Sequence, residues 1–275
     1  MSSRKVTECL AKAFSAARPD IEVLSFVMAD GGEGTVAALL SGKRPGVRND
    51  STSGNSSSPE SGAPSGNSFR TVTSTVSDPL GRPVSASFAI DGEGVCVMEM
   101  SAASGLTLLS PEERNPLLTS TCGTGELITK ALDEGCRDFI VGLGGSATND
   151  AGTGMLQALG FRFLDKDGKP LNACGAALED IASIDGDGAD PRLADCHFKL
   201  ACDVRNPFCG PQGAAFVFAP QKGADAATVQ RLDAGMRHFA DMILEHTGRD
   251  ITGTPGAGAA GGGHTPEEHR RDPAQ

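Results

Sequence analysis

Short apolar segments alternate with helical segments along most of this chain, and glycine-rich loops join several of them. An apolar run at 21–28 leads into the glycine-rich sequence ADGGEGT and then into a helical pattern at 36–40. The same order recurs from 138 to 159, where the glycine-rich sequence is GLGGSATND. Strands that alternate with helices are typical of α/β folds, in which helices cover the faces of a sheet. We therefore expect an α/β protein.

Turn sequences indicate that part of the sheet is antiparallel. Three strand-like stretches at 70–76, 84–90 and 95–100 are separated only by the short turns DPLG and DGEG. Strands joined by such turns predict an antiparallel meander. Later stretches show either helical spacing of apolar residues or short apolar runs. They predict helices at 123–135 and 225–246, strands at 138–141, 161–164 and 198–202, and a further short apolar segment at 214–218.

The composition changes abruptly between 41 and 68, where Ser, Gly, Asn, Pro and Arg predominate. Such a segment cannot bury enough apolar surface to order itself, so we expect a disordered insertion. The 275 residues suit one large domain or two ordinary ones. We expect four parts: the N-terminal part of a first α/β domain at 1–44, the insertion at 45–69, an inserted α/β domain with the start of a return to the first domain at 70–262, and an unrelated polar tail at 263–275.

The charge and the cysteine content argue against several classes of function. The chain has 35 Asp and Glu against 24 Lys and Arg, a net charge of −11 that would repel a nucleic acid or an anionic membrane surface. No apolar run approaches the roughly 20 residues of a membrane span, and the N-terminus lacks the apolar core of a secretory signal. The eight cysteines form no CxxC pair. We therefore expect reduced cysteines, a cytoplasmic protein, and no nucleic-acid or membrane partner.

The glycine-rich loops are the strongest candidates for a binding site. Backbone amides in such loops can approach an anion closely, and a helix N-terminus favours negative charge. The loop with Gly144, Gly145 and Ser146 therefore predicts a phosphate site. Mg²⁺ is usually held by one or two carboxylates together with phosphates, which is the arrangement that phosphoryl transfer needs. The acidic residues that stand beside glycine turns or at strand ends are Asp30, Glu33, Asp150 and Asp203.

Two other interpretations of the same loop remain open. The sequence GLGGSA fits the G-x-G-x-x-A pattern of dinucleotide binding, with Asp165 at a suitable separation for a ribose hydroxyl. The chain would then be an NAD-binding oxidoreductase, although Asp150 would place a carboxylate where the pyrophosphate lies. The loop could also be a tight turn that binds nothing.

A series of short motifs runs through the chain and is interrupted only by the serine-rich stretch. The motifs are ADGGEGT at 29–35, SGL at 104–106, RNP at 114–116, GTGELI at 123–128, GLGGSATND at 142–150, DVRNP at 203–207, FAPQKGA at 218–224 and PGAGAAGG at 255–262. In sequence and in order this series resembles the glycerate kinase family, the bacterial-type glycerate 2-kinases of type 1. A collinear series across 1–262 is far more specific than a single glycine loop.

The resemblance implies ATP-dependent phosphorylation of D-glycerate with Mg²⁺, giving phosphoglycerate and more specifically 2-phosphoglycerate. It also implies two α/β domains with the active site between them, a flavodoxin-like inserted domain and a restriction-endonuclease-like or Rossmann-like first domain. We assign the roles by side-chain chemistry: carboxylates would bind the metal or act as bases, and lysine would neutralise negative charge. We expect Asp203, Asp30 and Glu33 in catalysis, Gly144, Gly145, Ser146 and Lys222 at the nucleotide phosphates, Asn206 and Asn149 at the substrate, and Asp150 and Asp203 at the metal.

The sequence also departs from the family pattern. Family members open with a strand and a DSFKG-type loop and later contain a TGEG-type loop, and this sequence contains neither. We therefore expect an incomplete first domain, truncated at both ends. Ala151 replaces a glycine of the family motif. A non-catalytic fragment that binds a ligand or a full-length partner without turnover is the alternative function.

Overall fold

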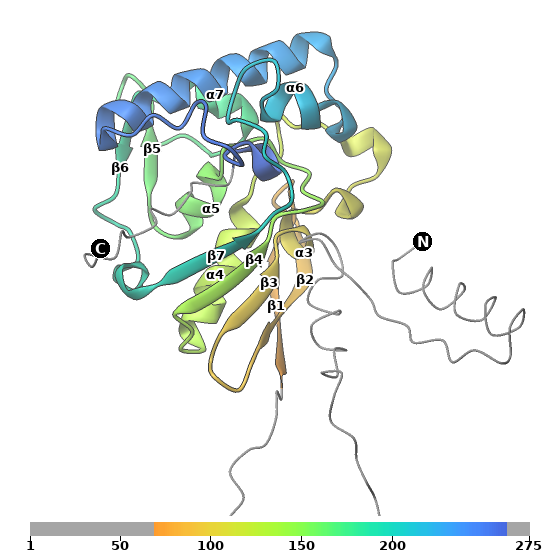
Figure 1. The fold of residues 1–275 in the computed structure, drawn as a ribbon, viewed down its shortest axis with the longest axis vertical. Coiled ribbons are helices and arrows are strands. Elements are labelled where there is room, and N and C mark those ends of the chain that lie inside the picture. Colours follow the sequence, from red (N-terminus) through yellow and green to blue (C-terminus); the bar gives the residue numbers. More distant parts are fainter. Residues whose placement is uncertain (1–68, 263–275) are drawn as a thin grey trace, which may run out of the picture.

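The computed structural model describes residues 69–262, which form a mixed sheet with helices packed around it (Figure 1). The expected parts at 1–44 and 263–275 lie outside the described residues, and so does nearly all of the expected insertion. The candidate carboxylates Asp30 and Glu33 are likewise outside them. Residues 70–262, for which we expect an inserted α/β domain, are therefore the part of the chain whose predictions can be compared with a structure.

The main sheet has the strand order β1-β2-β3-β4-β7. Its first half is antiparallel and consists of β1 (Arg70–Ser77), β2 (Pro83–Ile90) and β3 (Cys96–Glu99). Its second half is parallel, because β3 pairs with β4 (Asp138–Gly142) and β4 pairs with β7 (His197–Ala201). The predicted antiparallel meander and the predicted α/β class are both confirmed.

Helix α4 (Cys122–Asp133) covers one face of this sheet. Its residues Leu127 and Ile128 are buried in the same apolar cluster as Met98 of β3 and Phe139 of β4. The spacing of the apolar residues along 123–135 predicts this arrangement, since residues three and four apart lie on one side of a helix. The predicted helix is confirmed, and it begins one residue earlier and ends two residues earlier than expected.

Helix α5 (Thr153–Ala158) packs against α4 at very short range. A Cβ atom on Gly125 would overlap the carbonyl oxygen of Met155 in α5, and a Cβ atom on Gly123 would overlap the carbonyl oxygen of Ser77. The glycines of the GTGELI motif are therefore packing residues, which let the helix approach its neighbours on two sides. Glu126 of the same motif joins α4 to β1, because its carboxylate accepts hydrogen bonds from the N–H and the Oγ of Ser77.

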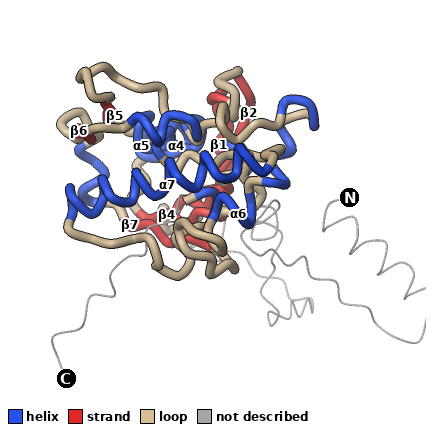
Figure 2. The backbone as a smooth tube through the Cα atoms, turned by 90° about the horizontal axis from the view of Figure 1, so that it is seen from above, coloured by secondary structure: helices blue, strands red, loops and turns tan. Residues whose placement is uncertain are grey.

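A second layer lies beyond the carboxyl ends of the parallel strands (Figure 1). It contains α6 (Ala214–Phe218), α7 (Ala226–Thr247) and a two-stranded sheet of β5 (Arg162–Leu164) and β6 (Ser183–Asp185). Figure 2 shows α7 crossing above the strands of the main sheet. This layer has its own apolar cluster, to which α7, α6 and the loops around them contribute, so the described residues have two cores rather than one.

The boundaries of α7 follow from its terminal residues. The Asp225 carboxylate accepts a hydrogen bond from the backbone N–H of Thr228 at 2.8 Å, which caps the N-terminus. Gly248 ends the helix with a φ of 74°, a left-handed conformation that glycine adopts without strain. The predicted helix at 225–246 is thus confirmed to within one residue at each end. None of the helices in residues 69–262 has both the length and the apolar character that crossing a membrane requires.

Several short elements escape prediction. The segment at 214–218 is the helix α6, and β6 lies in a stretch for which the sequence predicts no strand. The remaining connections are short helical turns. They are α3 (Ser101–Ser104), η1 (Leu106–Leu108), η2 (Pro111–Glu113), η3 (Gly175–Asp180), η4 (Pro191–Asp195), η5 (Pro220–Lys222) and η6 (Ala259–Gly261).

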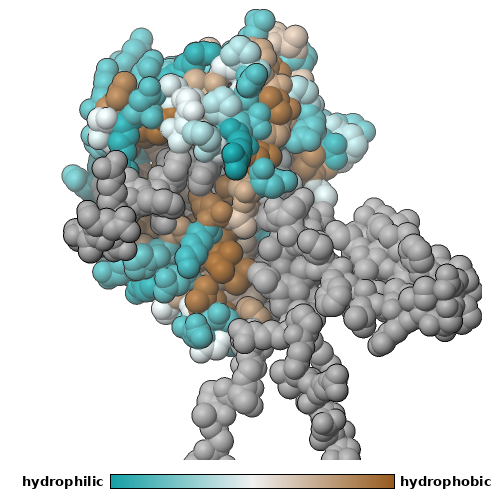
Figure 3. All heavy atoms as spheres, in the orientation of Figure 1, coloured by the Kyte–Doolittle hydropathy of each residue, from teal (hydrophilic) through white to brown (hydrophobic). Residues whose placement is uncertain are grey.

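The face of the main sheet opposite α4 also carries apolar side chains. Val97 of β3 and Ile140 of β4 are register partners, and they alternate with the residues that face α4. Figure 3 shows a strip of apolar surface over the strands on the side turned to the viewer. Apolar residues on both faces are expected of parallel strands, which are normally covered on both sides.

The contact between α4 and α5 gives a test of the packing. We expect Gly125→Ala to destabilise the protein by about 2 kcal/mol or more, because the added methyl group has backbone atoms in its way. Gly92→Ala is the matched control, since a Cβ atom at Gly92 meets nothing within 4 Å. Urea unfolding of the three proteins measures the difference. Equal free energies of unfolding for the two variants would contradict the packing role of Gly125.

Candidate functional site

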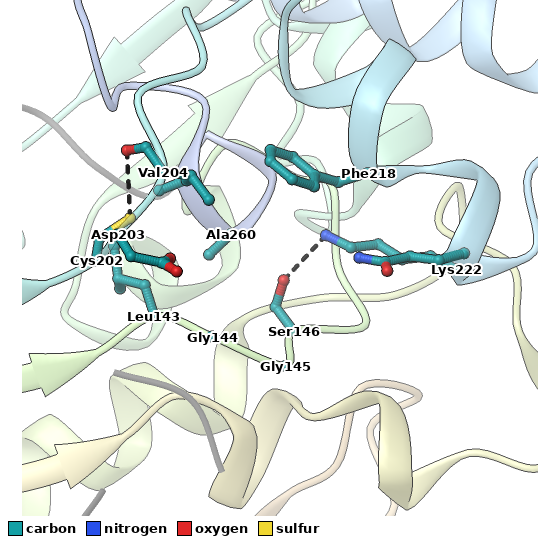
Figure 4. Close-up of a pocket in the computed structure, with 12 residues that line it drawn as sticks. Leu143, Gly144, Gly145, Ser146, Cys202, Asp203, Val204, Phe218, Lys222 and Ala260 are labelled. Carbon is teal, nitrogen blue, oxygen red and sulfur yellow. Dashed lines mark hydrogen bonds between the residues drawn. The ribbon is translucent and has the colours of Figure 1, made fainter. Parts of the chain in front are cut away.

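A cavity of about 160 Å³ lies where the carboxyl ends of β4 and β7 meet η5 and η6 (Figure 4). Its wall comes from segments that are far apart in the sequence. Five of the predicted site residues line it, namely Gly144, Gly145, Ser146, Asp203 and Lys222. The structure therefore brings the predicted phosphate loop, one predicted carboxylate and the predicted lysine together in one place.

The loop after β4 forms one wall of the cavity. Gly145 has a φ of 75°, which a residue with a side chain adopts only with strain. Two hydrogen bonds on either side of Ser146 hold the loop against residues 104–106. The N–H of Leu106 donates to the Gly145 carbonyl at 2.9 Å, and the N–H of Ala147 donates to the Ser104 carbonyl at 2.8 Å.

The backbone amides of this loop are available to a ligand. Within residues 69–262, the N–H groups of Gly144, Gly145 and Ser146 donate to no other group of the protein. Successive unpaired amides around a left-handed residue form a concavity that attracts anions. The loop is thus suited to a phosphate group.

Lys222 lies behind this loop and is almost completely buried, with 2% of its surface exposed. Its Nζ donates to the carbonyl of Thr148 at 2.5 Å and lies 2.9 Å from the Oγ of Ser146 (Figure 4). Burial lowers the pKa of the Lys222 ammonium to about 7, and the charge of Asp150 acts in the opposite direction. Near neutral pH this lysine is therefore divided between the charged and the neutral form.

Asp203 provides the carboxylate of the cavity. It follows β7 by two residues and is exposed, and Figure 4 shows its carboxylate pointing into the cavity. A carboxylate beside unpaired amides matches the usual way in which Mg²⁺ is held, by one or two carboxylates and the oxygens of a phosphate. Asp203 therefore fits a magnesium ion that arrives with a phosphorylated ligand.

Asp150 has a different environment from the one expected for a metal ligand. It is fully buried and does not line the cavity. Its carboxylate accepts hydrogen bonds from the N–H and Oγ1 of Thr121, both at 2.8 Å, and from the N–H groups of Gly152 and Gly154. Burial raises the pKa of Asp150, and these hydrogen bonds lower it. The residue joins the start of α4 to the start of α5.

The two asparagines expected at the substrate do not line the cavity either. Asn206 donates from Nδ2 to the carbonyl of Gln212 at 2.8 Å. Asn149 is fully buried, and its Nδ2 lies 3.1 Å from the Sδ of Met236 in α7. The Nδ2 of each thus has a partner in the protein, whereas the buried Oδ1 of Asn149 has no partner within the described residues.

Several residues of the cavity are not among the predicted ones. Ala259 and Ala260 come from the glycine-rich run near the end of the described residues. This run lies against the phosphate loop, since the N–H of Ala151 donates to the carbonyl of Gly261 at 3.0 Å. The GAGAAGG motif is the sequence signal that could have identified them. The remaining lining residues are Leu143, Cys202, Val204, Phe218 and Gln221.

The dinucleotide interpretation needs an acidic residue on a strand next to β4. Asp165 follows β5, which belongs to the separate two-stranded sheet. Its carboxylate accepts hydrogen bonds from the N–H groups of Asp167 and Lys169, within its own turn. The structure does not bring Asp165 to the glycine loop, so it gives this interpretation no support.

A larger cavity of about 580 Å³ lies between the main sheet and the helices α4 and α5. Its lining is mostly aliphatic, with Met155, Leu156 and Leu159 from the region of α5. It contains none of the predicted site residues. The smaller cavity is the candidate site because it combines amides, a carboxylate and an amine.

Comparison with known proteins identifies the family. The model of the glycerate kinase family matches residues 1–62 and 63–265. The chain belongs to the glycerate kinase family. It is 44% identical over 263 residues to a glycerate kinase of Haemophilus influenzae and 41% identical over 263 residues to a glycerate 2-kinase of Escherichia coli.

A solved structure agrees with this membership of the glycerate kinase family. The chain aligns with a crystal structure described as glycerate kinase 2 from Salmonella typhimurium LT2, with a TM-score of 0.74 and 40% identity. The alignment covers 95% of this chain and 64% of that one. The alignments with the two relatives named above cover 95% of this chain and 63% of the length of each relative. The chain thus spans a little under two thirds of the family members that it matches.

The buried lysine predicts a pH dependence of stability. The pKa of Lys222 is about 7 in the folded protein against an ordinary value of 10.5, so between these values only the unfolded chain holds the proton. The free energy of unfolding should therefore rise with pH in this window, by at most about 1.4 kcal/mol per pH unit. Lys222→Met removes the group and its contribution to that slope.

Urea unfolding of the two proteins between about pH 7 and pH 9 measures this effect. We expect the stability of the wild type to rise relative to that of Lys222→Met as the pH increases. Subtracting the two profiles cancels the titration of all groups that the substitution leaves unchanged. Parallel profiles would contradict the lowered pKa of Lys222.

Proposed function

We propose that this chain provides the phosphate-binding side of a glycerate kinase site, at which a phosphoryl group passes from ATP to D-glycerate. The observation that carries the proposal is the set of three unpaired amides that share a cavity with the Asp203 carboxylate. A volume of about 160 Å³ is below the roughly 300–1,000 Å³ of typical small-molecule sites. It suits a phosphoryl group rather than a whole nucleotide.

The roles of the residues follow from their chemistry. The amides of Gly144, Gly145 and Ser146 donate to the oxygens of the transferred phosphoryl group, where they stabilise the charge of the transition state. The Asp203 carboxylate holds Mg²⁺, which neutralises phosphate charge when it is bound. Asp30 and Glu33 are proposed as the carboxylates that face glycerate, on the basis of their glycine-rich motif alone.

The product is proposed to be 2-phosphoglycerate. The support for this regiochemistry is the relative from Escherichia coli, which is named a glycerate 2-kinase and is 41% identical over 95% of this chain. Cytoplasmic location is proposed as well. The seven cysteines of the described part of the chain are free thiols, as expected in a reducing compartment.

A second candidate is a protein that binds nucleotide without turnover. The observation that favours it is the lining of the cavity, which holds the loop amides and Asp203 but neither of the asparagines expected at the substrate. Calorimetric binding of Mg-ATP and a coupled assay of ATP consumption with D-glycerate distinguish the two. Binding with turnover supports the kinase, binding without turnover supports the second candidate, and the absence of binding contradicts both.

The metal site gives a further prediction. We expect Mg-ATP to raise the melting temperature by several degrees, and ATP with EDTA to have a much smaller effect, because Asp203 holds the metal and the metal holds the phosphates. Asp203→Asn should remove most of the Mg-ATP effect and leave the melting temperature of the free protein nearly unchanged, since the residue is exposed. Differential scanning fluorimetry measures all of these temperatures.

A matched control uses another exposed carboxylate. Asp187 lies in the turn after β6 and does not line the cavity. Asp187→Asn changes the net charge by the same amount and should keep the full effect of Mg-ATP. Equal protection by ATP with and without Mg²⁺ would rule out Asp203 as a metal ligand.

A further inference from the structure

The hydroxyl of Ser146 and the amine of Lys222 form an isolated pair in the interior. Their Oγ and Nζ atoms are 2.9 Å apart, and both residues are at least nine-tenths buried. The only other hydrogen-bond partner of Nζ within residues 69–262 is the carbonyl oxygen of Thr148. A carbonyl oxygen can only accept, so one N–H of the amine is committed to it.

The hydrogen-bond inventory decides the direction of the bond between the two side chains. A neutral amine has two N–H groups and one lone pair, and of the two partners that Nζ has within residues 69–262 only the hydroxyl of Ser146 can donate to the lone pair. In the neutral form of Lys222, the O–H of Ser146 therefore donates to Nζ. This arrangement draws the proton away from Oγ and makes the oxygen more nucleophilic.

The environment shifts Lys222 from the ammonium toward the neutral amine. Within the described part of the chain Lys222 forms no ion pair, and an isolated ammonium is costly to bury. The nearest negative charge is that of Asp150, whose two carboxylate oxygens already accept hydrogen bonds from Thr121 and from the start of α5. Asp150 attracts the ammonium from a distance but makes no contact with it.

The cavity supplies the third part of a nucleophilic site. Ser146 lines the cavity beside Gly144 and Gly145, and the amides of all three residues have no acceptor in the protein. Amides placed next to a nucleophile stabilise the negative oxygens of the group that it attacks. The cavity thus brings a hydroxyl, an amine and unpaired amides together.

We propose that Ser146 is a nucleophile activated by Lys222, and that it takes up a phosphoryl group from an activated phosphoryl donor in the cavity. The Oγ–P bond forms while the bond between phosphorus and the leaving group breaks. The leaving group departs with the electron pair, and the hydroxyl proton moves to Nζ. With a nucleoside triphosphate as donor, the leaving group is the nucleoside diphosphate and the product is phosphoserine.

This proposal rests on the proposed function only for the identity of the natural donor. The reactivity of Ser146 itself needs no nucleotide and no glycerate. Diisopropyl fluorophosphate is therefore the probe, because it phosphorylates activated serines with loss of fluoride. The reagent is applied to the folded 275-residue chain, and mass spectrometry of peptides identifies the modified residue.

We expect a single adduct on Ser146 of the wild type and none on Ser146→Ala. Ser85→Ala is the matched control, since Ser85 is an exposed serine of β2, and it should react like the wild type. An unmodified wild type, or an adduct on another serine only, would overturn the proposal. The location of the adduct is read from the wild type alone, so this part of the test does not depend on whether a variant folds.

Two variants of the lysine separate activation from structural support. Lys222→Met removes the base, and Lys222→Arg keeps hydrogen-bond donors but cannot accept a proton. We expect labelling to slow by about 100-fold or more in both, the effect of losing a general base. Labelling of either folded variant at the wild-type rate would overturn the role of Lys222. Thermal melting of both variants checks that they are folded.

A final arm uses Mg-ATP without glycerate and looks for phosphate on the Ser146 peptide. Phosphoserine at this position supports nucleoside triphosphate as the donor. Labelling by the fluorophosphate with neither binding of Mg-ATP nor phosphoserine leaves the nucleophile standing and contradicts the proposed function. Binding of Mg-ATP with an unreactive Ser146 leaves the proposed function standing and overturns the role of Ser146 as a nucleophile.

Discussion

The fully buried carboxylate of Asp150 is the contact on which the site and both helices beside it depend. It accepts hydrogen bonds from Thr121 at the start of α4 and from Gly152 and Gly154 at the start of α5. Two helix N-termini and four donors offset part of the cost of burying its charge, and burial still raises the pKa of Asp150. Since Asp150 belongs to the loop that begins with Gly144, the same contact positions the unpaired amides of this loop relative to the sheet. Removing the carboxylate would leave these donors unsatisfied in the interior.

Close approach of backbone segments is the second constraint. Gly125 admits α5 against α4, and Gly261 admits the glycine-rich run against the carbonyl of Thr148. Ala151 has a φ of 53°, a left-handed conformation at the position where the family motif contains glycine. At Gly144 and Gly145 the wall of the cavity consists of backbone alone. Such a stretch presents amides to a ligand, which is what binding of a phosphate requires.

The candidate site was predictable in part. Gly144, Gly145, Ser146, Asp203 and Lys222 stand in motifs that the sequence displays, and the structure places all five around one cavity. Asp150 has the same sequence signal as Asp203, a carboxylate next to a strand or a glycine turn. The difference between them is burial, and burial depends on α4 and α5 closing over one residue while the end of β7 leaves the other exposed. Periodicity and motifs do not indicate which of the two carboxylates becomes buried.

The sequence by itself determined the α/β class, the antiparallel meander, the helices α4 and α7 and the family. These follow from local patterns of apolar residues, turns and glycines, which act within a few residues along the chain. Only the tertiary structure decided which polar groups meet. Lys222 and Ser146 are 76 residues apart in the sequence, and their contact at 2.9 Å exists because η5 packs against the loop after β4. The state of that lysine is likewise set by the atoms that exclude water from it, and these come from several segments.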